Sequence, residues 1–427
     1  MQKIKFNSSI LKITLIFCLF YISILIGFYF NEDSLGGAEG DFNYHYKISL
    51  AFSKNFFETF NGFGTQEAAM ETRNSPVFWI ILSQVSKFIS YDILRIINSF
   101  ASILICLYFF KCLKIRYKDT ESFILALIAC SIFLSPTVRS LSIWPYSLIW
   151  GLLFFVMSIF HFLKYLNARN EIDKFKQTLI TVFFVALSAY FYPAFGIFFL
   201  FYSINFFFNY NLNQKFFLIL IFSLFLATPF LYYILSKDVL DAFEGAQGMS
   251  MNNFNTFNMS NKILIISTMI LFLIAPILNF KLIKKEITNL KSIEILVLVI
   301  FGLINIYFFS YPEYDSGFGG GFFYKLSNIF FNNNYLFFIF SIFSIIYIYT
   351  ILKKNYYNSL IFLTLILFNP QLTIYNKYYD PLILIIFTTL INFDFKKHYF
   401  EKKYKTLQLY FFGIFYLMIG LFKSQVY

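Results

Sequence analysis

The feature that most constrains this chain is a series of continuous apolar runs of about 17 to 25 residues, repeated from end to end. A run of that length crosses the hydrocarbon core of a bilayer as one α-helix. The strands of a membrane barrel would instead alternate apolar and polar residues, which these runs do not. The chain is 59% hydrophobic and 13% charged, whereas a soluble domain carries about 25% charged residues. The sequence therefore predicts an all-α, polytopic integral membrane protein.

We predict about 13 transmembrane helices. They cover residues 10–30, 92–110, 123–136, 145–163, 178–192, 193–208, 216–235, 263–279, 293–309, 335–351, 358–368, 379–393 and 407–422. Lys3, Lys5 and Lys12 precede or begin the first run, so the positive-inside rule places the N-terminus in the cytoplasm. The short basic links then lie inside and the longer polar loops outside. We expect residues 1–427 to form a single transmembrane domain in a bacterial inner membrane.

The apolar segment 76–90 is an exception, because it falls short of the roughly 20 residues that a crossing needs. If it crossed, the basic segment 111–118 would lie outside, against the charge rule. We therefore expect a short interfacial helix on the outer face. It would belong to an outer catalytic loop that covers residues 31–90.

Charge and cysteine content narrow the function classes. The net charge of +12 does not indicate nucleic-acid binding, because the cations lie mostly in short loops between spans, where they set topology. The cysteines are Cys18, Cys106, Cys112 and Cys130. They lie within or at the ends of apolar runs and form no CxxC pair, so we expect no disulfide and no metal site built on them. We expect no required cofactor and leave a divalent metal open.

The polar loop of residues 31–75 is rich in acids. Its carboxylates are Glu32, Asp33, Glu39, Asp41, Glu58, Glu67 and Glu71, against the cations Lys47, Lys54 and Arg73. Asp41 precedes Tyr44 and His45 by one helical turn, so the three side chains can lie close together. A carboxylate beside apolar walls can act as a general base on a sugar hydroxyl. The alternative is that Asp41 is simply a solvated loop acid.

Two arginines near prolines are candidate phosphate ligands. Arg73 lies shortly before Pro76, and Ser75 is a suitable N-cap for a helix that begins there. A helix N-terminus beside an arginine forms an anion site, although a plain cap with a solvated arginine explains the same residues. Arg139, in the expected outer loop 137–144, is a weaker candidate for the same role.

Two late outer loops carry further candidates. The glycine-rich segment 313–321 contains Asp315 and leads to Lys325. Its glycines would let the backbone approach a ligand closely, and they equally allow a flexible turn. In the loop 369–381, Lys377 lies beside Tyr378, which suits a phosphate of a lipid carrier at the membrane surface. The alternative is an interfacial anchor, since tyrosine and lysine both favour that depth.

The order of motifs over residues 10–110 resembles a known family. The first span is followed by the acidic motif of residues 40–45, then by the proline-led segment 73–79, and then by a span that begins with Arg95. This order is similar to that of the GT-C superfamily of membrane glycosyltransferases, which use polyprenyl-phosphate-linked sugars. Family members often have two adjacent acids in this loop. Here Gly40 precedes Asp41, which leaves metal use open.

The resemblance implies an inverting glycosyltransferase on the extracytoplasmic face. Asp41 would deprotonate an acceptor hydroxyl on a lipid-linked glycan or protein, and polyprenyl phosphate would leave. The residues expected to bind substrate are Tyr44, His45, Arg73, Arg139, Asp315, Lys325, Lys377 and Tyr378. The alternative is a transporter, flippase or polymerase of lipid-linked glycans. Transport is disfavoured because the centres of the spans are nearly free of charge.

Overall fold

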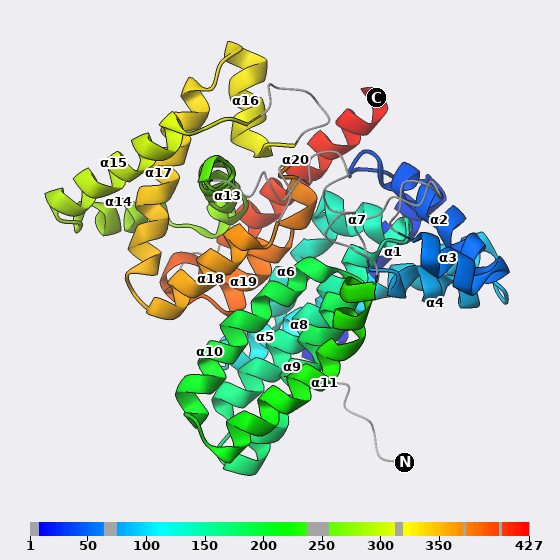
Figure 1. The fold of residues 1–427 in the computed structure, drawn as a ribbon. Coiled ribbons are helices and arrows are strands. Elements are labelled where there is room, and N and C mark those ends of the chain that lie inside the picture. Colours follow the sequence, from blue (N-terminus) through cyan, green and yellow to red (C-terminus); the bar gives the residue numbers. More distant parts are fainter. Residues whose placement is uncertain are drawn as a thin grey trace. The chain divides into compact units, whose positions relative to one another are not determined.

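The computed structural model of this protein describes residues 8–63, 75–236, 256–311, 319–369, 373–400 and 404–426 (Figure 1). Within these ranges the regular structure is helical, and the one β-bridge joins Gly319 to Ile374. The all-α prediction is therefore confirmed for the described residues. Two predicted site residues, Arg73 and Asp315, lie outside them.

The chain divides into two compact units. The first unit comprises Met1–Tyr233 and Thr406–Tyr427, and the second comprises Ile234–Lys405. Whether the two act as a single domain stays a prediction, and each is described here by itself.

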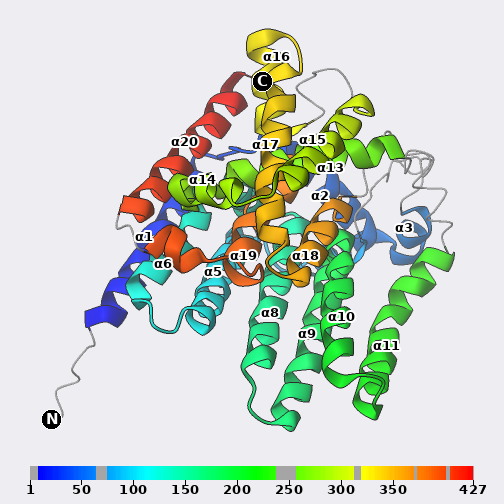
Figure 2. The same cartoon turned by 90° about the vertical axis from the view of Figure 1, so that its left-hand side faces the viewer.

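The first unit is built around long apolar helices. Its helices are α1 (Ser8–Tyr29), α2 (Ala38–Lys54), α3 (Phe56–Gly62), α4 (Val77–Val85), α5 (Tyr91–Arg116), α6 (Ser122–Cys130), α7 (Pro136–Ile143), α8 (Ser147–Asn167), α9 (Glu171–Phe191), α10 (Phe198–Tyr210), α11 (Gln214–Ser236) and the C-terminal α20 (Tyr404–Val426). Helix α8 packs along both α5 and α9 (Figure 2). Helix α1 packs against α6 and α7. Gly151 lets α8 approach the residues after α9 closely, because a Cβ there would meet Tyr192 Cβ at 2.9 Å.

The second unit surrounds one buried helix. Its helices are α13 (Thr256–Ile274), α14 (Phe280–Thr288), α15 (Ser292–Tyr307), α16 (Gly321–Phe331), α17 (Tyr335–Leu352), α18 (Tyr356–Leu367) and α19 (Leu382–Thr389). Helix α13 contacts α15, α16, α17, α18 and α19. Its side chains Leu264, Ile266 and Ile270 are fully buried. Apolar residues on all sides of a helix fit such a central position.

The number of membrane-spanning helices is smaller than predicted. Eight of the described helices are long and apolar enough to cross a membrane, and up to ten spans result if each of two bent helix pairs counts as one. The multi-pass character is supported, but the count of about 13 is not confirmed. Helix α19 has 8 residues, so it is about 12 Å long against a hydrocarbon core of about 30 Å. Helix α18 has only 12 residues, and α9 carries charged residues in its first two turns.

The loop 31–90 contains the short helices α2, α3 and α4, of which the last falls in the segment where one short helix was expected. Helix α4 ends at Val85 and has 9 residues, so it is shorter than the expected segment 76–90 and too short to cross a bilayer. It begins one residue later than expected, with Pro76 at the N-cap. Ser75 still accepts a hydrogen bond from Val77 N–H at 3.3 Å.

The segment 137–144 is not the polar outer loop that we predicted. Residues 136–143 form α7, and all of them are buried. The chain bends by 67° between α6 with its 3-10 extension and α7. Ser135 caps α7 by accepting a hydrogen bond from Val138 N–H at 3.1 Å. This buried cap is why the helix starts at Pro136, which needs no N–H partner.

Candidate functional site

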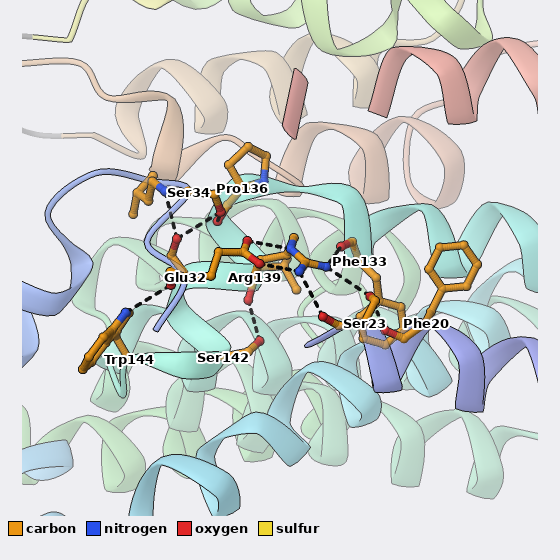
Figure 3. Close-up of polar contacts among 12 residues, drawn as sticks. Phe20, Ser23, Glu32, Ser34, Phe133, Pro136, Arg139, Ser142 and Trp144 are labelled. Carbon is orange, nitrogen blue, oxygen red and sulfur yellow. Dashed lines mark hydrogen bonds and ion pairs between the residues drawn. The ribbon is translucent and has the colours of Figure 1, made fainter. Parts of the chain in front are cut away.

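The polar centre of the first unit is an ion pair between Glu32 and Arg139 (Figure 3). Each side chain is only 8% exposed. Arg139 Nε donates to Glu32 Oε1 at 2.7 Å, and Nη2 donates to Glu32 Oε2. This two-point geometry is the strong form of an arginine–carboxylate contact.

The remaining donors of Arg139 are also engaged. Nη1 donates to Ser23 Oγ at 3.1 Å and to the Phe133 carbonyl at 3.5 Å, and Nη2 donates to the Ser23 carbonyl at 3.0 Å. A guanidinium has five N–H donors, so the protein itself engages all five. Arg139 would therefore have to give up contacts within the protein to act as the predicted phosphate ligand.

Backbone close to the ion pair leaves no room for extra atoms. A Cβ on Gly27 of α1 would clash with Glu32 Oε2 and lie 3.1 Å from Arg139 Nη2. The chain turns back after α1 because Asn31 adopts a left-handed conformation, with φ 50°. Glu32 N–H then donates to the Gly27 carbonyl at 2.8 Å. The carboxylate is thus placed over the last turn of α1 by the backbone itself.

A second arginine holds the other side of this turn. The Arg95 guanidinium lies 3.8 Å from the centroid of the Trp144 ring, and its Nη2 donates to Asn31 Oδ1 at 2.8 Å. Trp144 Nε1 in turn donates to the Glu32 carbonyl at 3.1 Å. Arg95 and Arg139 therefore fix two consecutive residues of the loop, Asn31 and Glu32.

The next residues of the loop connect this centre to α2. Leu35 N–H donates to Ser140 Oγ of α7 at 2.8 Å. Asp33 accepts hydrogen bonds from the backbone of Gly36 at 3.1 Å, Gly37 at 2.8 Å and Glu39 at 3.2 Å. Its carboxylate thereby satisfies N–H groups at the start of α2, where a negative charge is also favourable.

Asp41 lies in the first turn of α2 and is half-buried. Contacts of the next two residues hold this end of the helix. Phe42 is fully buried, and its ring centroid lies 5.3 Å from that of Tyr91 and 6.4 Å from that of Trp144. Tyr91 hydroxyl also donates to Asn43 Oδ1 at 2.9 Å. Asp41 therefore sits on a helix whose position is fixed by α5 and by the residue after α7.

The two aromatic neighbours of Asp41 differ in their surroundings. Tyr44 is 40% exposed. His45 is 7% exposed, and its ring stacks on Trp79 of α4 with centroids 4.4 Å apart and planes 10° apart. His45 therefore joins α2 to α4, a packing role that the sequence did not indicate. Its predicted contact with substrate is not tested.

In the second unit, the two late loops that the sequence singled out are joined. Gly320 N–H donates to the Ile374 carbonyl at 2.8 Å, and Ile374 N–H donates to the Tyr311 hydroxyl at 2.9 Å. Gly319 and Gly320 have φ of 83° and 87°. A Cβ on Gly319 would clash with the Ile374 carbonyl, so the glycines serve close backbone packing here. Burial raises the pKa of the Tyr311 hydroxyl above its ordinary value.

The predicted lysines lie on elements next to this junction. Lys325 is half-buried in α16, the helix that the glycine turn begins. Lys377 is half-buried in a 3-10 turn, Asn376–Tyr378. Its Nζ lies 5.5 Å from the ring centroid of Tyr375 and 5.8 Å from that of Tyr378. These cation–π contacts are compatible with either predicted role, phosphate ligand or anchor.

Sequence reasoning missed the residues that organise both units. Glu32 and Asp33 are two of the seven acids in the loop 31–75. The neighbouring sequence does not show that Glu32 forms a buried ion pair or that Asp33 binds the start of α2. Asn261 and Lys262, at the start of the apolar part of α13, are also buried, and Asn261 Oδ1 accepts from Ser310 N–H at 3.0 Å. Two polar residues next to a long apolar run were the feature of the sequence that could have identified them.

Among the described residues, no group of three or more His, Cys, Asp or Glu side chains is arranged to hold a metal ion. The described cysteines are free, and Cys106 Sγ lies 4.0 Å from Cys130 Sγ. Comparison of this chain with protein-family models, with curated proteins and with solved structures gave no match.

Proposed function

We propose that this protein is a membrane glycosyltransferase that moves a sugar from a polyprenyl-phosphate donor to an acceptor on the extracytoplasmic face. The observation that supports it best is the placement of Asp41. Asp41 is half-buried in the first turn of a helix that Asp33 caps and that Phe42 anchors. A general base must be held in a defined position while it stays accessible to the hydroxyl that it deprotonates.

In the proposed reaction, Asp41 accepts the proton of the acceptor hydroxyl. The oxygen attacks the anomeric carbon of the donor sugar, and the bond between that carbon and the phosphate oxygen breaks. Polyprenyl phosphate leaves, and the configuration inverts. Lys325 and Lys377, with Arg73 outside the described residues, are the proposed ligands of the donor phosphate. Tyr44, His45, Asp315 and Tyr378 complete the proposed substrate contacts.

The second candidate is a transporter, flippase or polymerase of lipid-linked glycans. Buried charge inside the first unit is the feature that favours transport, since Arg139 and Glu32 lie within a mostly apolar structure. The contacts between Glu32 and Arg139 weigh against transport. These charged groups bind each other, whereas a transport site needs groups that a cargo can reach. A flippase would move the lipid-linked sugar without changing the acceptor.

The test is mass spectrometry of lipid-linked sugars and surface glycans in cells with and without the gene. We expect loss of the gene to remove one sugar from the acceptor and to accumulate the unused donor. Complementation with Asp41→Asn should fail to restore the product, because removal of a general base costs on the order of 10² to 10⁴ in rate. Complementation with Glu39→Gln, which removes the same charge from the same helical turn, should restore it.

Two outcomes would contradict the proposal. If the Asp41 variant is made in normal amounts and restores the product while the Glu39 variant does not, Glu39 is the base. If loss of the gene moves an intact lipid-linked sugar to the wrong side of the membrane without changing its composition, the protein is a flippase.

A further inference from the structure

Helix α14 of the second unit differs from every span around it. It has 9 residues, Phe-Lys-Leu-Ile-Lys-Lys-Glu-Ile-Thr, so it is about 14 Å long and cannot cross a bilayer. It meets α15, an apolar helix, at 105°. A short helix that carries both lysines and apolar residues is suited to lie along a membrane surface.

Specific contacts fix α14 in this direction. Asn279 caps it by accepting a hydrogen bond from Lys281 N–H at 3.1 Å, and Asn279 N–H donates to His398 Nδ1 at 3.2 Å. Ile283 is buried, with 3% exposed. Near its C-terminal end, Glu286 Oε1 accepts from Lys354 Nζ at 2.5 Å. The helix is therefore attached at its beginning, its middle and its end.

The same contacts leave this surface with an excess of positive charge. The two acids of the segment are neutralised internally, Glu286 by Lys354 and Glu294 by Lys353 at 3.5 Å. The remaining lysines of the segment are all exposed. They are Lys281, Lys284, Lys285 and Lys291, and none of them has an ion-pair partner among the described residues.

Apolar side chains lie exposed beside these lysines. Phe280 is 64% exposed and Ile293 is 61% exposed. Phe280 begins α14 and Ile293 lies in the first turn of α15, so they flank the four lysines in sequence. Lysines beside exposed apolar side chains are typical of helices at the boundary between lipid headgroups and acyl chains.

We propose that α14 and the start of α15 form a binding site for the headgroups of anionic phospholipids. The lysines would contact the lipid phosphate and headgroup, while Phe280 and Ile293 would lie among the acyl chains. The exposed apolar residues favour a lipid over a free anion, which would use the charge alone. This inference is independent of the proposed enzymatic activity.

The test is native mass spectrometry of the purified full-length protein with equal amounts of phosphatidylglycerol and phosphatidylcholine that carry the same acyl chains. We expect retention of phosphatidylglycerol in preference to phosphatidylcholine. Lys284→Gln with Lys285→Gln should lower phosphatidylglycerol retention on the order of tenfold, because each lysine near an anionic surface contributes substantially to binding. Retention of phosphatidylcholine should not change.

The control is Lys174→Gln with Lys215→Gln, since both of these lysines already face Glu171, at 3.9 Å and 3.2 Å. It removes the same charge and should keep the lipid preference. Equal loss in both double variants, or no loss in the first, would overturn the proposal. Displacement of phosphatidylglycerol by inorganic phosphate would also overturn it, because the site would then bind free anions. A thermal melt equal to that of the unmodified protein confirms that the variants are folded.

Discussion

Glu32 and Arg139, separated by 107 positions in the sequence, form a two-point ion pair from which water is nearly excluded. The pair connects the end of α1 to α7, and the next residue, Asp33, caps the helix that carries Asp41. The position of the proposed base therefore depends on a contact that is distant from it in sequence.

The first prediction concerns this ion pair. Glu32→Gln or Arg139→Met alone should lower the free energy of unfolding by roughly 3–5 kcal/mol, because each leaves a buried charge without its partner. Chemical unfolding in detergent measures this change. The exposed pair of Glu171 and Lys215 is the control, and Glu171→Gln should cost at most about 1 kcal/mol. Similar costs for both pairs would show that Glu32 and Arg139 are solvated.

The second prediction concerns Gly27. Gly27→Ala should destabilise the first unit, because the new methyl group would occupy the place of the Glu32 carboxylate. Gly40→Ala is the matched control, since nothing lies within 4 Å of a Cβ there. Alanine in the helix at position 40 should be neutral or stabilise by about 1 kcal/mol. Thermal unfolding of both variants distinguishes the clash from a general effect of removing glycine.

The third prediction concerns Asp33. Asp33→Ala should remove the cap of α2 at a cost of about 1 kcal/mol and increase hydrogen exchange at the amides of residues 36–41. Asp33→Asn, which keeps a capping oxygen, should show a smaller increase. Hydrogen exchange followed by mass spectrometry gives the comparison. Unchanged exchange in the alanine variant would mean that α2 is held by its aromatic contacts alone.

The fourth prediction concerns the glycine turn of the second unit. Gly320→Ala combines a left-handed φ of 87° with a clash against the Tyr324 ring, whereas Gly36→Ala has a left-handed φ of 73° with open space around it. The Gly320 variant should therefore lose more stability than the cost of about 1–2 kcal/mol expected from the backbone conformation alone. Equal losses in thermal unfolding would show that the packing of this turn is loose.

The fifth prediction concerns topology. A cysteine in place of Asn61 should react with an impermeant thiol reagent added outside the cell, and one in place of Asn289 should not. Cys18 is exposed in the structure and should be replaced by serine first, whereas the other cysteines are buried. Reaction of only the Asn289 variant would reverse the orientation and place Asp41 on the cytoplasmic side.

The apolar runs determined from the sequence alone that this protein is helical and multi-pass. The prediction succeeds because the length and hydrophobicity of each apolar run can be read directly from the sequence. A helix also satisfies the hydrogen bonds of its own backbone wherever lipid surrounds it. The same reasoning indicated that the segment 76–90 is too short to cross a bilayer, and α4 covers only Val77–Val85 of it. The number of spans did not follow, since α18 has only 12 residues and only the 8 residues Leu382–Thr389 of the apolar run 379–393 form α19.

Only the tertiary structure decided which polar residues belong together. Nothing near Glu32 in the sequence identifies Arg139 as its partner, and nothing near Gly320 identifies Ile374. The fold places Arg139, a candidate phosphate ligand, in the buried ion pair of the first unit, and Asp33, one acid among seven, at the start of α2. The physical reason is that a buried charge is stabilised by whichever groups the fold brings within hydrogen-bonding distance, whatever their separation along the chain.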